Sequence, residues 1–459
     1  MDKGPLQQLI DILYEAFDKL DARLAMQDLE RIAVLVHRAM TVHARYFHTL
    51  EHVFSFSTSD DPIQALSACF HDIVYYQVDQ GFHPDIEALV APYIRQHNSG
   101  FMILDIIPQD DLAINLALDV FDFKPGHFLA PNNGLNEFLS ALVMNRTLEN
   151  IIAPQDLLKT TVCIEATIPF QGRNERGESH IEVLKKRLEA INQKYAFGFS
   201  REQIDDILKL AVNFSNKDTE NFSEPDPGDF LDNTWKLLPE SNPTLRWQGI
   251  YSVRDYRVAI QNMERFFSWL NPDLIFNRYL DEPPEEKYRQ MVERAHLNVY
   301  TAREYLRVKL LAIAILEALV ELTGGDAPLS LFTGSIPQGG EKSNYYEGYW
   351  HEPRVSSVTH EESIILRLLG SGRAHEVSFD LKNSPLSFFL FTRLGQPQIN
   401  LLVREASAMF RGQITPQQFL SQIDAKIVAA VASACAEICF TRRERLMKLI
   451  SELRRSEIA

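Results

Sequence analysis

Residues 61–75 read DPIQALSACFHDIVY, and this stretch decides how the N-terminal half of the chain should fold. Asp61 followed by Pro62 is a helix start signal, because an aspartate caps free backbone N–H groups and a proline fits the first helical turn. The mostly apolar positions that follow lead directly to His71 and Asp72. We therefore predict a buried helix that carries an adjacent histidine and aspartate at its end.

A second histidine-containing stretch lies just upstream, where residues 45–53 read RYFHTLEHV. His48 and His52 are four positions apart, so on a helix they share one face. Two interpretations are open at this point. Either these histidines lie on a helix surface and the His71-Asp72 pair merely ends a helix, or the two stretches converge. Converging imidazole and carboxylate groups would suit a divalent metal ion.

A metal site of this kind has a clear chemical use. Hydrolysis of a phosphate ester needs a hydroxide at neutral pH and a positive charge beside the developing negative charge, and a bound metal ion supplies both. His52, His71 and Asp72 offer three ligands, so a further carboxylate should come from downstream.

The remainder of the chain has a mostly helical pattern. One apolar stripe follows the i, i+3, i+4, i+7 spacing of an amphipathic helix, namely Leu6, Leu9, Ile10, Leu13 and Phe17. After Pro283-Pro284 a long helical pattern runs to Gly324-Gly325, where glycine favours a helix end. Residues 325–384 are rich in glycine, serine, proline and tyrosine, and residues 376–379 form a strand-like run.

These patterns predict an all-α fold. We expect a helical-bundle domain over residues 1–240 and a large, mostly helical C-terminal region over residues 241–459, which contains a short irregular or hairpin segment. The C-terminal region carries no motif that assigns it a role.

Composition and charge exclude several classes of protein. The chain has 459 residues, of which 45% are hydrophobic and 24% charged, so global disorder is excluded. Its formal net charge of -16 argues against a surface for duplex nucleic acid, which needs a basic face. No apolar stretch approaches the length of a membrane span, and no Cys-x-x-Cys pair occurs among the four cysteines. We expect a cytoplasmic protein with no membrane or nucleic-acid partner.

The two histidine-containing stretches resemble the motifs of the HD superfamily of metal-dependent phosphohydrolases. In that superfamily a distant histidine, an adjacent His-Asp pair and a later aspartate come from one helical core. The chain is most similar to the branch with an Arg-x-Tyr-His-x-x-x-His opening and a His-Asp-x-Val-Tyr second motif, although Phe47 replaces the usual tyrosine. Later elements of that branch match in the same order, after a long insertion: residues 136–141 (NEFLSA), 164–167 (IEAT) and 214–218 (FSNKD).

The resemblance covers roughly residues 30 to 220 and implies a set of functional residues. His52, His71, Asp72 and Asp218 would bind one or two divalent metal ions, with Mn, Mg, Fe, Co and Zn as candidates. The order of motifs is also similar to that of cyclic-nucleotide phosphodiesterases, in which a histidine four residues before the first metal ligand protonates the leaving oxygen. His48 has that place here, while Glu137 would act as a ligand or base and Arg45 would face a phosphate.

The fourth metal ligand has competitors in the sequence. Asp119 and Asp122 lie nearer to the His-Asp pair than Asp218 does, and either could close the site before residue 125. We favour Asp218 because the intervening motifs keep the familiar order.

The implied activity is hydrolysis of a phosphate ester, with a nucleotide or cyclic nucleotide as the expected substrate, by attack of a metal-bound hydroxide. Two other functions fit the same scaffold. One is a non-catalytic protein that senses a nucleotide or binds a partner, including a second copy of this chain. The other is a di-iron oxygenase of the same fold.

Overall fold

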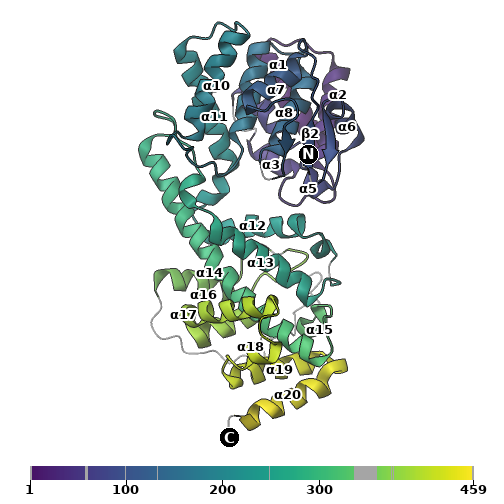
Figure 1. The fold of residues 1–459 in the computed structure, drawn as a ribbon, viewed down its shortest axis with the longest axis vertical. Helices are drawn as coiled ribbons and strands as arrows, with labels where there is room; N and C mark the ends of the chain where they lie inside the picture. The colour runs from purple at the N-terminus through teal and green to yellow at the C-terminus, as the bar shows by residue number, and fades with distance from the viewer. Residues whose placement is uncertain are drawn as a thin grey trace. The chain divides into compact units, whose positions relative to one another are not determined.

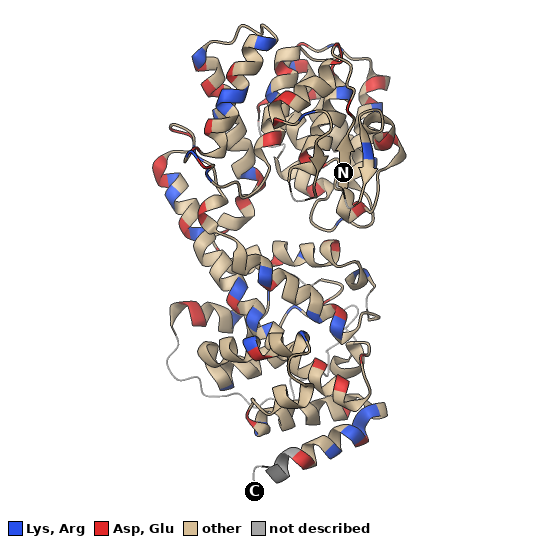
Figure 2. Ribbon diagram, in the orientation of Figure 1, with Lys and Arg blue, Asp and Glu red and all other residues tan. Residues whose placement is uncertain are grey.

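The computed structural model confirms the all-α class. It describes residues 3–56, 60–98, 100–131, 133–247, 249–334, 359–373, 375 and 377–456. Helices contain 67% of the residues, and a single small sheet contains 4%. None of the helices in these ranges is long and apolar enough to span a membrane. In Figure 2, the ribbon positions of acidic and basic residues are interspersed along the helices.

The chain divides into two compact units. The N-terminal unit comprises residues 1–223 and 271–295, and the C-terminal unit comprises residues 224–270 and 296–459. The sequence pattern predicted a single domain boundary after residue 240, and this division differs from it. Residues 271–295 lie far along the chain but pack with the N-terminal unit. Two hydrogen bonds join Asn277 of this segment to Asn216. The backbone N–H of Asn277 donates to Asn216 Oδ1 at 2.7 Å, and Asn216 Nδ2 donates to the carbonyl oxygen of Asn277 at 2.8 Å.

The N-terminal unit is built around α4 (Pro62–Phe70), in which every residue from Ile63 onward is buried. Asp61 caps α4 as predicted, because its carboxylate accepts hydrogen bonds from the backbone N–H groups of Ile63 and Gln64. Helices α1, α3, α8 and α9 pack against α4. The helices of this unit (Figure 1) are α1 (Pro5–Lys19), α2 (Met26–Met40), α3 (Leu50–Phe56), α4, α5 (Tyr76–Asp79), α6 (Pro84–Val90), α7 (Leu112–Phe121), α8 (Leu135–Leu148), α9 (Pro154–Ala166), α10 (His180–Lys194) and α11 (Arg201–Asp218).

A small antiparallel sheet interrupts the helices of this unit. Strands β1 (Ile94–His97), β2 (Gly100–Ile103) and β3 (Phe128–Leu129) lie in that order, and Phe101 pairs with Leu129. A side chain at Gly100 would overlap the carbonyl oxygen of Leu129, so the close approach of β2 to β3 requires glycine. The sequence pattern did not predict this sheet.

The C-terminal unit is organised along the second part of α14 (Glu285–Thr323), which begins in the N-terminal unit. The bounds of α14 confirm the helix predicted between Pro284 and Gly324. The other helices are α12 (Pro227–Ser241), α13 (Val253–Trp269), α15 (Ser330–Thr333), α16 (His360–Gly370), α17 (Pro385–Phe410), α18 (Pro416–Leu420), α19 (Ala425–Ile438) and α20 (Arg443–Ser456). Helix α17 bends at Gly395, which has a left-handed φ of 67°.

The hairpin suggested by residues 376–379 is not formed by the residues that the structure describes there. Val377 and Asp380 share an isolated bridge, but no strand extends from it. Glu376, which began the strand-like run, lies outside the described residues.

Candidate metal centre

Three helix ends bring the predicted metal ligands together in the N-terminal unit. His52 lies on α3, His71 and Asp72 directly follow α4, and Asp218 is the last residue of α11. The buried, apolar α4 places its end inside the unit, so that His71 is only 2% exposed. Residues separated by more than 160 positions thus share one site.

Each imidazole faces both carboxylates. His71 Nε2 lies 3.1 Å from Asp72 Oδ2 and 3.7 Å from Asp218 Oδ1. His52 Nε2 lies 3.6 Å from Asp72 Oδ2 and 3.4 Å from Asp218 Oδ1. Neighbouring ligands of one cation with bonds of about 2.1 Å are separated by about 3.0–3.5 Å, so these distances suit ligands around a shared ion. His52, His71 and Asp218 also offer ligand atoms that all lie within 4.8 Å of one another.

Three of the ligand atoms are buried without a hydrogen bond. His52 Nε2, His71 Nε2 and Asp72 Oδ2 have no partner among the described residues. Buried polar atoms are costly unless they are satisfied by a partner or a metal ion. The donor set therefore fits a divalent cation.

The orientation of His71 is fixed by its second ring nitrogen. Nδ1 lies 2.9 Å from the carbonyl oxygen of Ala68, and since a carbonyl only accepts, Nδ1 carries the hydrogen. The neutral tautomer then presents the Nε2 lone pair to Asp72 and Asp218, as a metal-binding histidine requires. Phe56 packs on both His52 and His71, with ring centroids 4.9 and 5.0 Å apart, and so limits the movement of both imidazoles.

The electrostatics of the site follow from this mixture of imidazoles and carboxylates. Burial opposes a charge on His71, yet Asp72 and Asp218 raise its pKa well above the ordinary value. Burial likewise opposes the charge on Asp72, but His71 and His48 hold the pKa of Asp72 well below its usual range. Burial also opposes the charge on Asp218, but the nearby imidazoles of His52 and His71 hold its pKa below the ordinary value. Metal binding needs neutral imidazoles, so a cation would compete here with protons.

His48 lies beside the site but not on the helix that carries His52. Helix α3 begins at Leu50, and residues 46–49 form a bend, so the prediction of one shared helix face is wrong. The bend still brings the His48 ring to 5.9 Å from the His52 ring and 4.6 Å from that of Tyr75, measured between centroids.

Glu137 lies in the first turn of α8, where the charges of the site act on its carboxyl group. Burial raises its pKa to about 7, and the carboxylates of Asp72 and Asp218 act in the same direction. A carboxyl group with such a pKa exchanges protons readily at neutral pH.

Arg45 does not face a substrate, which corrects the role expected for it. Its side chain is 0% exposed and makes a two-pronged ion pair with Asp79, with Nε and Nη2 at 2.9 and 2.6 Å from the carboxylate oxygens. Nη1 donates to the carbonyl oxygen of Asp72 at 2.7 Å. Arg45 therefore holds the backbone of the His-Asp pair in place. No motif in the sequence indicated Asp79.

The two competing aspartates are held elsewhere. Asp119 accepts hydrogen bonds from Lys194 Nζ at 2.6 Å and from the Tyr195 hydroxyl at 2.7 Å. Asp122 ends α7 in a left-handed conformation with a φ of 56°. Of the three downstream candidates, Asp218 is the one whose carboxylate meets both histidines.

Comparison with known proteins adds no relative: no family model, no curated protein and no solved structure matches this chain.

Proposed function

We propose that the N-terminal unit is a metal-dependent phosphohydrolase of the HD type, acting on a phosphate ester such as a nucleotide or cyclic nucleotide. The observation that carries the proposal is the convergence of His52, His71, Asp72 and Asp218. The ligand atoms of the first three are buried and have no hydrogen-bond partner among the described residues. A divalent cation bound there would supply a hydroxide at neutral pH and a positive charge toward the phosphate oxygens.

The chain's own residues would carry out the proton transfers and form the surroundings of the reaction. The reaction forms one bond from a water oxygen to phosphorus and breaks the bond from phosphorus to the leaving oxygen. Glu137, whose pKa of about 7 suits proton transfer, takes a proton on the side of the attacking water. His48 gives a proton to the leaving oxygen. Phe56 and Phe214 surround the imidazoles with apolar surface and strengthen the interactions between charges there.

The test combines metal analysis with turnover. The purified chain, loaded with Mn²⁺, is assayed on bis(4-nitrophenyl) phosphate, 4-nitrophenyl phosphate and a panel of nucleotides. We expect turnover that a chelator abolishes, and loss of both bound metal and turnover in His71→Ala and Asp218→Ala. Glu137→Gln should keep the metal and lose about 100-fold or more in rate.

Asp119→Ala is the matched control, because it removes a carboxylate that is bound to Lys194 and Tyr195 instead. Equal metal content in the wild type and His71→Ala would refute the proposal. Stoichiometric iron with oxygen consumption and no phosphate release would instead favour an oxygenase. Tight nucleotide binding without turnover would favour a sensor.

A further inference from the structure

The C-terminal unit contains a pocket for which the proposed hydrolase gives no use. Its volume is about 100 Å³, and residues of α13, α14, α15 and the start of α17 line it together with residues 380–384. Its walls are largely apolar, formed by buried side chains such as Ile313, Leu316 and Leu386. Since an apolar cavity of about 150 Å³ takes up benzene, this pocket suits a body of about five carbon atoms.

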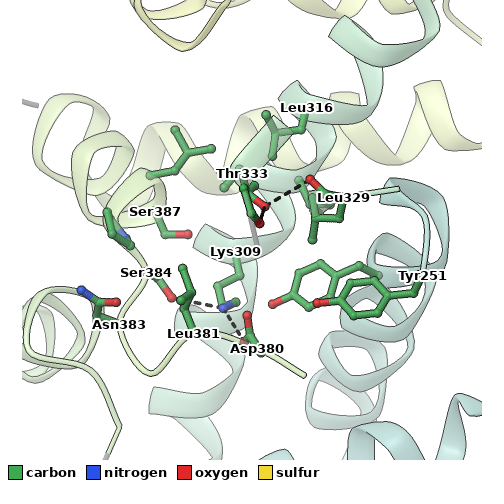
Figure 3. Close-up of a pocket in the computed structure, with 16 residues that line it drawn as sticks. Tyr251, Lys309, Leu316, Leu329, Thr333, Asp380, Leu381, Asn383, Ser384 and Ser387 are labelled. Atoms are coloured by element: carbon green, nitrogen blue, oxygen red, sulfur yellow. Dashed lines mark hydrogen bonds and ion pairs between the residues drawn. The ribbon is translucent and has the colours of Figure 1, made fainter. Parts of the chain in front are cut away.

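One end of the pocket carries a buried lysine. Lys309 is 6% exposed, and its Nζ donates to Asp380 Oδ2 at 3.0 Å and to Ser384 Oγ at 3.1 Å. Figure 3 shows Lys309 between these two residues. Asp380 and Ser384 accept two of the three N–H groups of this ammonium. Its Nζ also lies over the rings of Trp235, Tyr256 and Tyr305, at 5.0, 5.7 and 6.0 Å from their centroids.

Asp380 is fully engaged with its own neighbours. Its Oδ2 also accepts from Trp235 Nε1 at 2.9 Å and lies 3.5 Å from Nη1 of the buried Arg373. Arg373 also pairs with a second carboxylate, because its Nε lies 3.7 Å from Asp232 Oδ1. The network thus balances two cations against two carboxylates, and the pocket needs no ligand charge for compensation.

A buried hydroxyl without a hydrogen-bond partner lies next to the lysine, whose Nζ is 5.7 Å from the centroid of the Tyr256 ring. The Tyr256 hydroxyl is buried and makes no hydrogen bond to the described residues, although the residue lines the pocket and is only 5% exposed. Burial and the Asp380 carboxylate raise the pKa of Tyr256 well above its ordinary value, so the hydroxyl stays protonated. An unsatisfied buried hydroxyl is unfavourable unless a ligand or water completes it.

We propose that this pocket binds a compact, mostly apolar molecule through one carbonyl or carboxylate oxygen, which accepts hydrogen bonds from Lys309 and Tyr256. The Tyr256 hydroxyl lacks a hydrogen-bond partner and lies beside the Lys309 ammonium, so both can donate to one acceptor, and the apolar walls suit a short hydrocarbon body. A ligand with a cationic head is excluded, because it would meet the ammonium group of Lys309.

Three probes of one shape test this assignment: 3-methylbutanoate, 3-methylbutanamide and 3-methylbutylamine. Titration of the full chain, followed by ligand-observed NMR, should give millimolar dissociation constants for the acid or the amide, as is usual for molecules of this size. The amine should not bind. A crystal soaked with the bound probe should show its oxygen at Lys309 and Tyr256.

The variants use a matched pair of tyrosines that both line the pocket. Tyr256→Phe removes the hydroxyl without a partner and should weaken binding about tenfold while leaving the thermal midpoint unchanged or higher. Tyr251→Phe removes a hydroxyl that donates to the carbonyl oxygen of Phe379, and should leave the affinity unchanged. Ala312→Leu fills the pocket and should abolish binding. Amine binding equal to that of the acid, unchanged affinity in a folded Ala312→Leu variant, or a pocket filled by the chain's own residues would overturn the proposal.

Discussion

Arg45 offers a sharp test of how the His-Asp pair is held. Its guanidinium is fully buried and bound to Asp79 and to the carbonyl oxygen of Asp72. Arg45→Met would leave the Asp79 carboxylate, 13% exposed, without its cation. Breaking a buried ion pair by removing one partner costs about 3–5 kcal/mol. For a unit of about 250 residues this corresponds to a fall in the thermal midpoint of about 6–20 °C.

The partner variant separates the ion pair from other effects. Asp79→Leu alone should destabilise by a similar amount, because it leaves a buried guanidinium. The double variant Arg45→Met/Asp79→Leu should recover most of the loss, since apolar residues often replace a buried ion pair at little cost. It should not recover metal affinity fully, because the carbonyl oxygen of Asp72 still lacks its donor. A residual loss of about 10-fold is expected, as for other groups that support metal ligands.

The assay is thermal unfolding followed by circular dichroism, with Mn²⁺ titration of each variant. The reasoning fails if Arg45→Met melts at the wild-type temperature. A raised KM for a phosphate substrate with an unchanged melting temperature would show instead that Arg45 meets the substrate.

Three further predictions concern the site and its support. Mn²⁺ at about 100 times its dissociation constant should stabilise the wild type against unfolding by about 2.7 kcal/mol. The same concentration should leave the thermal midpoint of His71→Ala unchanged. An equal rise in the thermal midpoints of both proteins would show that the ion binds elsewhere. Asp119→Asn should retain the wild-type Mn²⁺ content, measured by mass spectrometry, and a loss would make Asp119 the ligand. Glu165 is buried against His180 and Arg187, and these two partners lower its pKa although burial acts in the opposite direction. Its ionised form therefore stabilises the fold fully at pH values above the ordinary pKa of 4.5. This contribution is lost as the pH falls through the lowered pKa. Glu165→Gln should therefore cost about 1.5–3 kcal/mol at pH 7 and progressively less in acid; a pH-independent difference in melting temperature would contradict this.

Local signals in the sequence were sufficient for several elements. The Asp61-Pro62 start of α4 and the limits of α14 between Pro284 and Gly324 follow from capping and from the backbone chemistry of proline and glycine, which act within one turn of a helix. The capping signals are readable because they depend on neighbours along the chain. The grouping of His52, His71, Asp72 and Asp218 was instead implied by the resemblance to HD-type motifs.

Other features had no local signal. Strands β1 to β3 are two to four residues long, and β3 lies 25 positions after β2, so neither alternation nor a short turn identifies the sheet. The bend at residues 46–49 removes His48 from α3, although its spacing to His52 is helical. The return of residues 271–295 to the N-terminal unit depends on packing between distant segments.

By itself, the sequence determined that this protein is helical, where its best-capped helices begin and end, and which imidazole and carboxylate groups are candidates for one site. Only the tertiary structure decided that Asp218 rather than Asp119 meets the two histidines, and that Arg45 supports the backbone instead of facing a substrate. The physical reason is that caps and periodicity act over one or two turns of chain. Burial and ion pairing depend on which side chains meet in space. Asp72 and Asp79 lie 27 and 34 positions from Arg45, and Lys194 and Tyr195 lie 75 and 76 positions from Asp119.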